Sequence, residues 1–118
     1  MIIEIQYKSS KLKNICHDFS KAKKEFGTIV AEKLHALINL LENAETLNDI
    51  NAMQIYNLHH LLGKRKGEYA LDLGRRLGYR LIITPLDDNG NKWKEKDINV
   101  MYKSTKIVLI LEVSNHYE

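Results

Sequence analysis

The chain has 118 residues, of which 44% are hydrophobic and 28% are charged, and its formal net charge is +3. This length predicts a single domain over 1–118, and the composition excludes an intrinsically disordered chain. The one cysteine, Cys16, excludes an intramolecular disulfide. The early charges and the absence of an apolar run of about 20 residues argue against a signal peptide and a membrane span, so we expect a cytoplasmic protein.

The N-terminal half has the pattern of one strand followed by two amphipathic helices. Residues 3–7 alternate between apolar and polar side chains, which is the period of a strand. Ser9 or Ser10 caps a helix that continues to Gly27, and Thr28 opens a second one. Their apolar faces consist of Leu12, Ile15, Cys16, Phe19, Ala22 and Phe26, and of Val30, Leu34, Leu37, Ile38 and Leu41. The sequence therefore predicts a helical hairpin.

The C-terminal half changes to short aromatic and β-branched runs separated by glycines. We expect four strands, at 55–62, 67–73, 79–84 and 106–113. Pro85 should end the third of them, because proline has no amide hydrogen to donate. Residues 107–111 are apolar on both faces, which indicates a central strand, and 86–104 reads as a polar segment anchored by Trp93. Early helices and late strands predict an α+β fold with a mostly antiparallel five-stranded sheet and the helical hairpin packed on it.

Positive charge is concentrated in two segments. Between residues 64 and 80, six basic residues outweigh Glu68 and Asp72, giving a local charge of +4. The six are Lys64, Arg65, Lys66, Arg75, Arg76 and Arg80. Between residues 8 and 24, six lysines face only Asp18. Such clustering suits a polyanion, and the forked donors of arginine suit phosphate, although a solvated helix face and a charged hairpin would give the same pattern.

The sequence offers no set of metal ligands. None of the five histidines has a partner four residues away on a helix, and His59 and His60 should point to opposite faces of a strand. The run Asp87–Asn91 lacks the glycine and the glutamate of a calcium loop. We therefore expect neither a metal nor a small-molecule cofactor.

The remaining residues suit metal-free cleavage of RNA, in which a 2′-hydroxyl attacks the neighbouring phosphate. This reaction needs a base, an acid and cations that stabilise the added negative charge. The candidate groups are His59, Lys64, Arg65, Lys66 and Arg80, with His116 and Tyr117 at the end of the last strand. A basic sheet that only binds RNA would carry much the same residues.

Three segments resemble one known family. Residues 58–73, LHHLLGKRKGEYALDL, resemble the central signature of the RelE/HigB-like toxins of bacterial type II toxin–antitoxin systems, His-x-Leu-x-Gly-x-Arg-x-Gly followed by an alternating strand. Residues 79–85, YRLIITP, are similar to the family's next strand, and residues 111–117, LEVSNHY, to its closing strand and catalytic tail. Together with length and strand order, the resemblance covers nearly the whole chain and implies a RelE-like fold.

The resemblance implies a ribosome-dependent mRNA endonuclease that inhibits translation and is held inactive by a cognate antitoxin, expected to be a helix-turn-helix protein. Carried over by position, His59 transfers a proton or orients the substrate. Arg65 and Lys66 hold phosphates, and Arg80 stabilises charge at the scissile phosphate. The family's tail reads Tyr-His, whereas this chain has His116-Tyr117, which leaves open which of the two is the acid or the base.

Three further cations complete the expected RNA contacts, and two other functions remain open. The cations are Lys64, which stands where relatives often carry an acidic residue, and Arg75 and Arg76. The protein could instead be a non-catalytic toxin–antitoxin partner of the "killer suppression" type, or a ParE-like poison of DNA gyrase. The proton-transfer groups favour the endonuclease, because a gyrase poison needs none.

Overall fold

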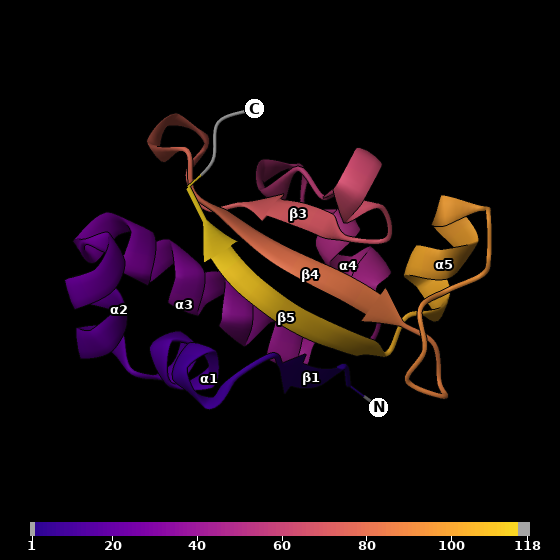
Figure 1. Ribbon diagram of the computed structural model, residues 1–118, viewed down its shortest axis with the longest axis horizontal. Helices are drawn as coiled ribbons and strands as arrows, with labels where there is room; N and C mark the ends of the chain where they lie inside the picture. The colour runs from indigo at the N-terminus through magenta and orange to yellow at the C-terminus, as the bar shows by residue number, and fades with distance from the viewer. Residues whose placement is uncertain (1, 116–118) are drawn as a thin grey trace.

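The computed structural model describes residues 2–115, which form a five-stranded sheet with its helices on one side (Figure 1). The elements in chain order are β1 (Glu4–Tyr7), α1 (Ser10–His17), α2 (Phe19–Phe26), α3 (Thr28–Asn43), α4 (Leu47–Asn51), the 3-10 turn η1 (Gln54–Tyr56), β2 (His59–His60), the 3-10 turn η2 (Gly63–Arg65), β3 (Tyr69–Asp72), the 3-10 turn η3 (Arg75–Leu77), β4 (Arg80–Leu86), α5 (Ile98–Ser104) and β5 (Ile107–Ser114). Among residues 2–115, none of the helices combines the length and the apolar composition that a membrane span requires.

The strand order across the sheet is β1-β5-β4-β3-β2. β1 runs parallel to β5, and the other three pairings are antiparallel. The prediction of a mostly antiparallel five-stranded sheet is therefore confirmed. β5 is an interior strand between β1 and β4, as its two apolar faces predicted, while β4 holds the middle position.

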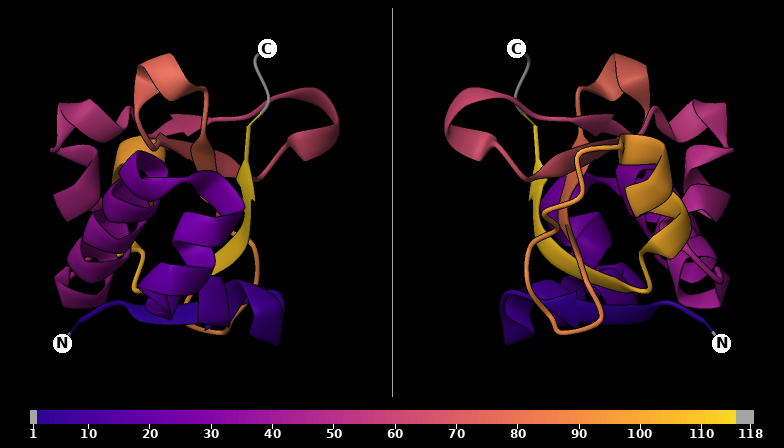
Figure 2. Two further views of the ribbon diagram at one scale, coloured as in Figure 1. Left: turned by 90° about the vertical axis from the view of Figure 1, so that its left-hand side faces the viewer. Right: turned by 90° about the vertical axis from the view of Figure 1, so that its right-hand side faces the viewer.

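The core lies between the sheet and α3. Fully buried side chains of α3 pack against those of the three central strands, and this cluster includes Leu34, Leu37, Leu41, Leu71, Leu81, Ile83, Val108 and Ile110. The apolar stripe predicted for the second helix is thus confirmed as the side that α3 turns to the sheet. Figure 2 shows that the turn between β2 and β3 projects on the opposite side of the sheet, away from α3.

The prediction of one continuous first helix is wrong, because the helix is interrupted at Asp18. This residue is extended, with φ −113° and ψ 106°, and its side chain accepts a hydrogen bond from the amide of Lys21 at 3.2 Å. It thereby ends α1 and caps α2. The break turns Phe19 out of the predicted apolar stripe, so that it is 40% exposed and packs edge-on against His35. The helical hairpin is formed by α2 and α3, which Gly27 joins.

Two strand predictions also need correction. The run 55–62 contains only the two-residue strand β2, preceded by the turn η1. Pro85 does not end its strand, since β4 continues to Leu86 and pairs there with β5. The reason is local: β3 pairs with β4 only as far as Ile83, so one edge of β4 is open where proline removes a donor.

The segment 86–104 is not entirely irregular, because its last seven residues form α5. Asp97 caps this helix by accepting from the amides of Asn99 and Val100. Met101 and Tyr102 are buried, and they join the half-buried Trp93 in anchoring the segment to the core.

His17 connects α1 to α3 through Nε2, while its Nδ1 makes a contact within α1. Nδ1 lies 2.9 Å from the carbonyl oxygen of Lys13, and Nε2 lies 3.0 Å from Oε2 of Glu42. Both partners only accept hydrogen bonds, so the protonated imidazolium satisfies both. The hydrogen bond to Glu42, followed by that to the Lys13 carbonyl, raises the pKa of His17.

We expect His17→Ala to lower the free energy of unfolding more at about pH 5.5 than at about pH 8. The unfolded-state pKa is about 6.5 and the folded-state pKa is higher, so the stabilisation is complete below the unfolded value. It is lost as the pH rises through the folded value. Urea unfolding at both pH values measures the difference, and Glu42→Gln should reproduce it. An equal loss at both pH values would contradict this account of the contact.

Candidate functional site

The register of the sheet decides which side chains face away from the helices. Leu81 points into the core, and alternate residues of a strand face opposite sides, so Arg80 and Ile82 lie on the open face. Glu112 pairs with Ile82, and Ser114 pairs with Arg80. The open face therefore brings together polar residues from the start of β4 and the end of β5.

A depression of about 450 Å³ lies on this face, between the sheet and the turn that follows β2. It is lined by Leu61, Leu62, Lys64, Arg65, Arg80, Ile82 and Ser114. The turn can reverse tightly because Gly63 and Gly67 adopt positive φ values of 67° and 93°. The basic turn of the sequence motif thus forms the wall of a hollow whose floor is β4 and β5, and three of its seven lining residues are cationic.

Arg80 contributes a guanidinium to the depression. Its Nε is buried in the protein and has no hydrogen-bond partner. A guanidinium keeps its charge at any physiological pH, and a buried donor without an acceptor costs free energy. Because the side chain lines the depression, an anion bound there would lie beside the guanidinium. A contact between Arg80 and an anion therefore stays a prediction.

Arg65 already has anionic partners. Its Nε donates to Oε1 of Glu68 at 2.8 Å, and its Nη2 donates to Oε2 of Glu112 at 3.2 Å. Partial burial acts to lower the pKa of Arg65, but the hydrogen bonds to Glu112 and Glu68 outweigh it and the pKa is raised. Sequence reasoning missed Glu112, whose only signal was a charge within an otherwise apolar strand.

His59 lies on the open face, and His60 points to the opposite side, as predicted. The ring of His60 stacks on core residue Tyr69 with centroids 5.0 Å apart. His59 pairs with Ala70, which pairs with Ile82, so two strand spacings separate it from β4. Its Nδ1 lies 2.7 Å from the carbonyl oxygen of Asn57 and must carry the proton of that hydrogen bond. In the neutral ring, Nε2 is then left with a lone pair that can accept a proton.

Lys64 lines the depression, but not all of the other predicted site residues lie there. Lys64 and Lys66 are exposed on the basic turn. Arg75 begins η3, and Arg76 lines a different hollow from Arg80. The predicted tail residues, His116 and Tyr117, lie outside the described residues. Among residues 2–115, no three His, Cys, Asp or Glu side chains are grouped so that they could hold a metal ion.

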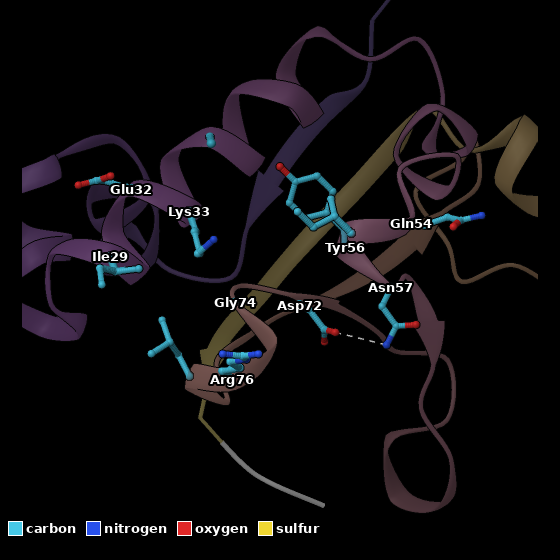
Figure 3. Close-up of a pocket in the computed structure, with 12 residues that line it drawn as sticks. Ile29, Glu32, Lys33, Gln54, Tyr56, Asn57, Asp72, Gly74 and Arg76 are labelled. Atoms are coloured by element: carbon cyan, nitrogen blue, oxygen red, sulfur yellow. Dashed lines mark hydrogen bonds between the residues drawn. The ribbon is translucent and has the colours of Figure 1, made fainter.

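A larger groove of about 940 Å³ lies between α3 and the turns η1 and η3 (Figure 3). Ile29, Ile55 and Leu77 line it and are among the most exposed apolar side chains. At one end, Asn57 donates a hydrogen bond to Asp72 at 3.3 Å, drawn as a dashed line in Figure 3. Asp72 lies on β3 beside Arg80, so the groove and the depression are near neighbours on the sheet.

Two solved structures resemble this one over nearly the entire chain. YoeB of Staphylococcus aureus, solved in complex with YefM, has a TM-score of 0.51 and 16% identity, with 99% of this chain and 100% of that chain covered. A YafQ mutant from E. coli, in which glutamine replaces a histidine, has a TM-score of 0.51 and 21% identity, with 95% and 91% covered. The chain has a RelE-like fold. No protein-family model matches the chain, and no curated protein matches it in sequence.

The three sequence segments that resemble the toxin family form neighbouring parts of the sheet. In this chain the segment with the signature-like motif forms β2, the basic turn and β3, and the segment that follows forms β4 with Arg80 at its start. The closing segment forms β5, which runs antiparallel to β4 and carries Glu112 beside Ile82. The three segments that carried the resemblance therefore meet around one depression.

Proposed function

We propose that this protein is the toxin of a type II toxin–antitoxin system and that it inhibits translation by cleaving mRNA on the ribosome. The observation that carries the proposal is the buried, unpartnered Nε of Arg80 in a depression walled by Lys64 and Arg65. A phosphodiester is the anion that best fits such a site, because arginine matches phosphate oxygens with forked donors. The RelE-like fold and the signature-like motif support the same conclusion.

The bonds that form and break in the proposed reaction all belong to the RNA, and side chains of the protein accept and donate the protons. The 2′-oxygen of one nucleotide attacks the adjacent phosphorus, and the bond from phosphorus to the 5′-oxygen of the next nucleotide breaks. His59 accepts the proton of the 2′-hydroxyl through Nε2, directly or through a water molecule. Arg80 stabilises the extra negative charge on the phosphate oxygens. His116 or Tyr117 protonates the departing 5′-oxygen.

The basic turn would bind the RNA strand on either side of the cleaved phosphodiester bond. Lys64 and Lys66 are exposed there and can follow neighbouring phosphates. Arg65 contributes less charge than its position in the motif implies, because Glu68 and Glu112 occupy its donors. Arg75 and Arg76 lie on η3, just before β4. We propose that they contact phosphates of the RNA farther from the cleaved bond.

A protein partner is the second part of the proposal. YoeB, which shares the fold, was solved in complex with YefM. We propose that a cognate antitoxin, a small helix-turn-helix protein encoded beside this chain, binds it and blocks the cleavage of mRNA. Coexpression of the neighbouring gene should restore growth, whereas coexpression of an unrelated helix-turn-helix protein should not.

The pairing of Arg65 with two carboxylates favours one alternative, a non-catalytic partner in a toxin–antitoxin pair. Induced expression followed by mapping of mRNA 5′ ends separates the two functions. The proposal predicts a rapid stop of translation and new ends inside coding regions. Continued translation without new ends would support the non-catalytic partner, and arrest through DNA damage would support a gyrase poison. Both results would contradict the endonuclease.

A further inference from the structure

Arg65 connects two parts of the sheet that are far apart in sequence. It lies at the end of η2, on the turn that projects over the open face, and Glu112 lies on β5, 47 residues later. Glu68 belongs to the same turn as Arg65, three residues further on. The contact with Glu68 therefore orients the guanidinium within the turn, while the contact with Glu112 ties the turn to the sheet.

The contact between Arg65 and Glu112 lies beside the depression. Arg65 belongs to its wall, and Glu112 pairs with Ile82, which belongs to its floor. A carboxylate and a phosphate bind the same donors of a guanidinium in the same forked geometry. Glu112 thus occupies one donor of Arg65, Nη2, that an RNA phosphate entering the depression would use.

Both partners remain accessible to solvent. The side chains of Arg65 and Glu112 are 41% and 43% exposed. An ion pair this exposed contributes little to stability, because water screens it and ordering two long side chains costs entropy. A phosphate brought in by a bound RNA strand can therefore replace the carboxylate. The contact with Glu68, whose side chain is only 22% exposed, would keep the guanidinium in place during the exchange.

We infer that Glu112 is a positioning residue that competes with RNA for Arg65. In the free protein its carboxylate neutralises one side of the guanidinium and holds the basic turn against β5. When RNA binds, a backbone phosphate replaces the carboxylate and Arg65 becomes a substrate contact. The inference rests on the proposed function only in naming RNA as the competing anion, since the tie itself lies within the protein.

Limited digestion with trypsin tests, without any RNA, whether the contact between Arg65 and Glu112 holds the basic turn against the sheet. Glu112→Gln should be cut after Lys64, Arg65 or Lys66 several times faster than the wild type, because the turn is released. Glu45→Gln is the matched control, since it removes the same charge from an exposed position before α4. Circular dichroism would show that both variants are folded. Equal cutting rates in Glu112→Gln and Glu45→Gln would overturn the inference.

The exchange is tested by binding of a single-stranded RNA whose 2′-hydroxyls are methylated, so that it cannot be cleaved. Glu112→Gln should bind it about two- to fivefold more tightly than Glu45→Gln, which corresponds to the loss of one exposed ion pair. In an Arg65→Ala background, Glu112→Gln should give no gain beyond Glu45→Gln.

The outcomes separate this inference from the proposed function. Equal affinities of Glu112→Gln and Glu45→Gln would overturn the exchange, as would a gain that persists without Arg65. A gain that depends on Arg65 supports the exchange, even if expression in cells produces no mRNA ends and the endonuclease is lost. Failure of every variant to bind RNA would overturn the exchange, and faster trypsin cutting would then still establish the tie.

Discussion

Replacing Arg80 with alanine is expected to abolish both growth arrest and mRNA cleavage while leaving the protein folded. Removing a group that stabilises transition-state charge lowers the rate by about 100- to 1000-fold in other enzymes. The side chain occupies the floor of the depression, and its Nε has no partner within the protein. Its loss therefore removes no hydrogen bond at Nε that supports the fold. Growth after induction and mapped mRNA ends measure the effect.

The controls for this prediction use two other variants. Arg80→Lys keeps the charge but not the fork, so we expect a rate between those of the wild type and Arg80→Ala. Lys103→Ala removes an exposed cation from α5 and should cleave like the wild type. A toxic, cleaving Arg80→Ala variant would exclude Arg80 from the proposed reaction.

Leu34→Ala is expected to lower the free energy of unfolding by about 2–5 kcal/mol, the range for a buried leucine whose removal leaves a cavity. Leu34 is fully buried on α3, within the cluster that joins the helices to the sheet. Ile29→Ala on the same helix is the control. Ile29 is 60% exposed, so its truncation should cost about 0.5 kcal/mol or less.

Urea unfolding followed by circular dichroism measures both values. Equal losses for the two variants would show that the apolar stripe of α3 does not form the core in the way described. A loss confined to Leu34→Ala would establish that this stripe supports the sheet on which the candidate site is built.

Much of the fold could be predicted because the sequence repeats with the period of its elements. The stripe from Val30 to Leu41 recurs at helical spacing and is buried as expected. The break at Asp18 escaped prediction because apolar residues continue in phase on both sides of it. α5 escaped because Asp97 caps a helix of only seven residues that leaves Val100 exposed. Local capping overrode the pattern in both cases.

Only part of the candidate site could be predicted from the sequence, because some of its contacts depend on the register in which the strands pair. The motif indicated that Arg65 and Arg80 belong to one surface, and both line the depression. The motif could not indicate that Glu112 faces Arg65, because that contact depends on how β4 pairs with β5 across a β-bulge between Ile82 and Ile83. Contacts between strands distant in sequence are fixed by the folded sheet and not by local spacing.

The chemical nature of the RNA ends tests the central claim most directly. Purified protein added to ribosomes translating a defined mRNA should produce fragments with a 2′,3′-cyclic phosphate on one side of the cut and a 5′-hydroxyl on the other. These ends follow from attack by the 2′-oxygen, and Arg80→Ala should not produce them. Fragments carrying a 5′-phosphate and a 3′-hydroxyl, or no fragments at all from the wild-type protein, would contradict the proposed reaction.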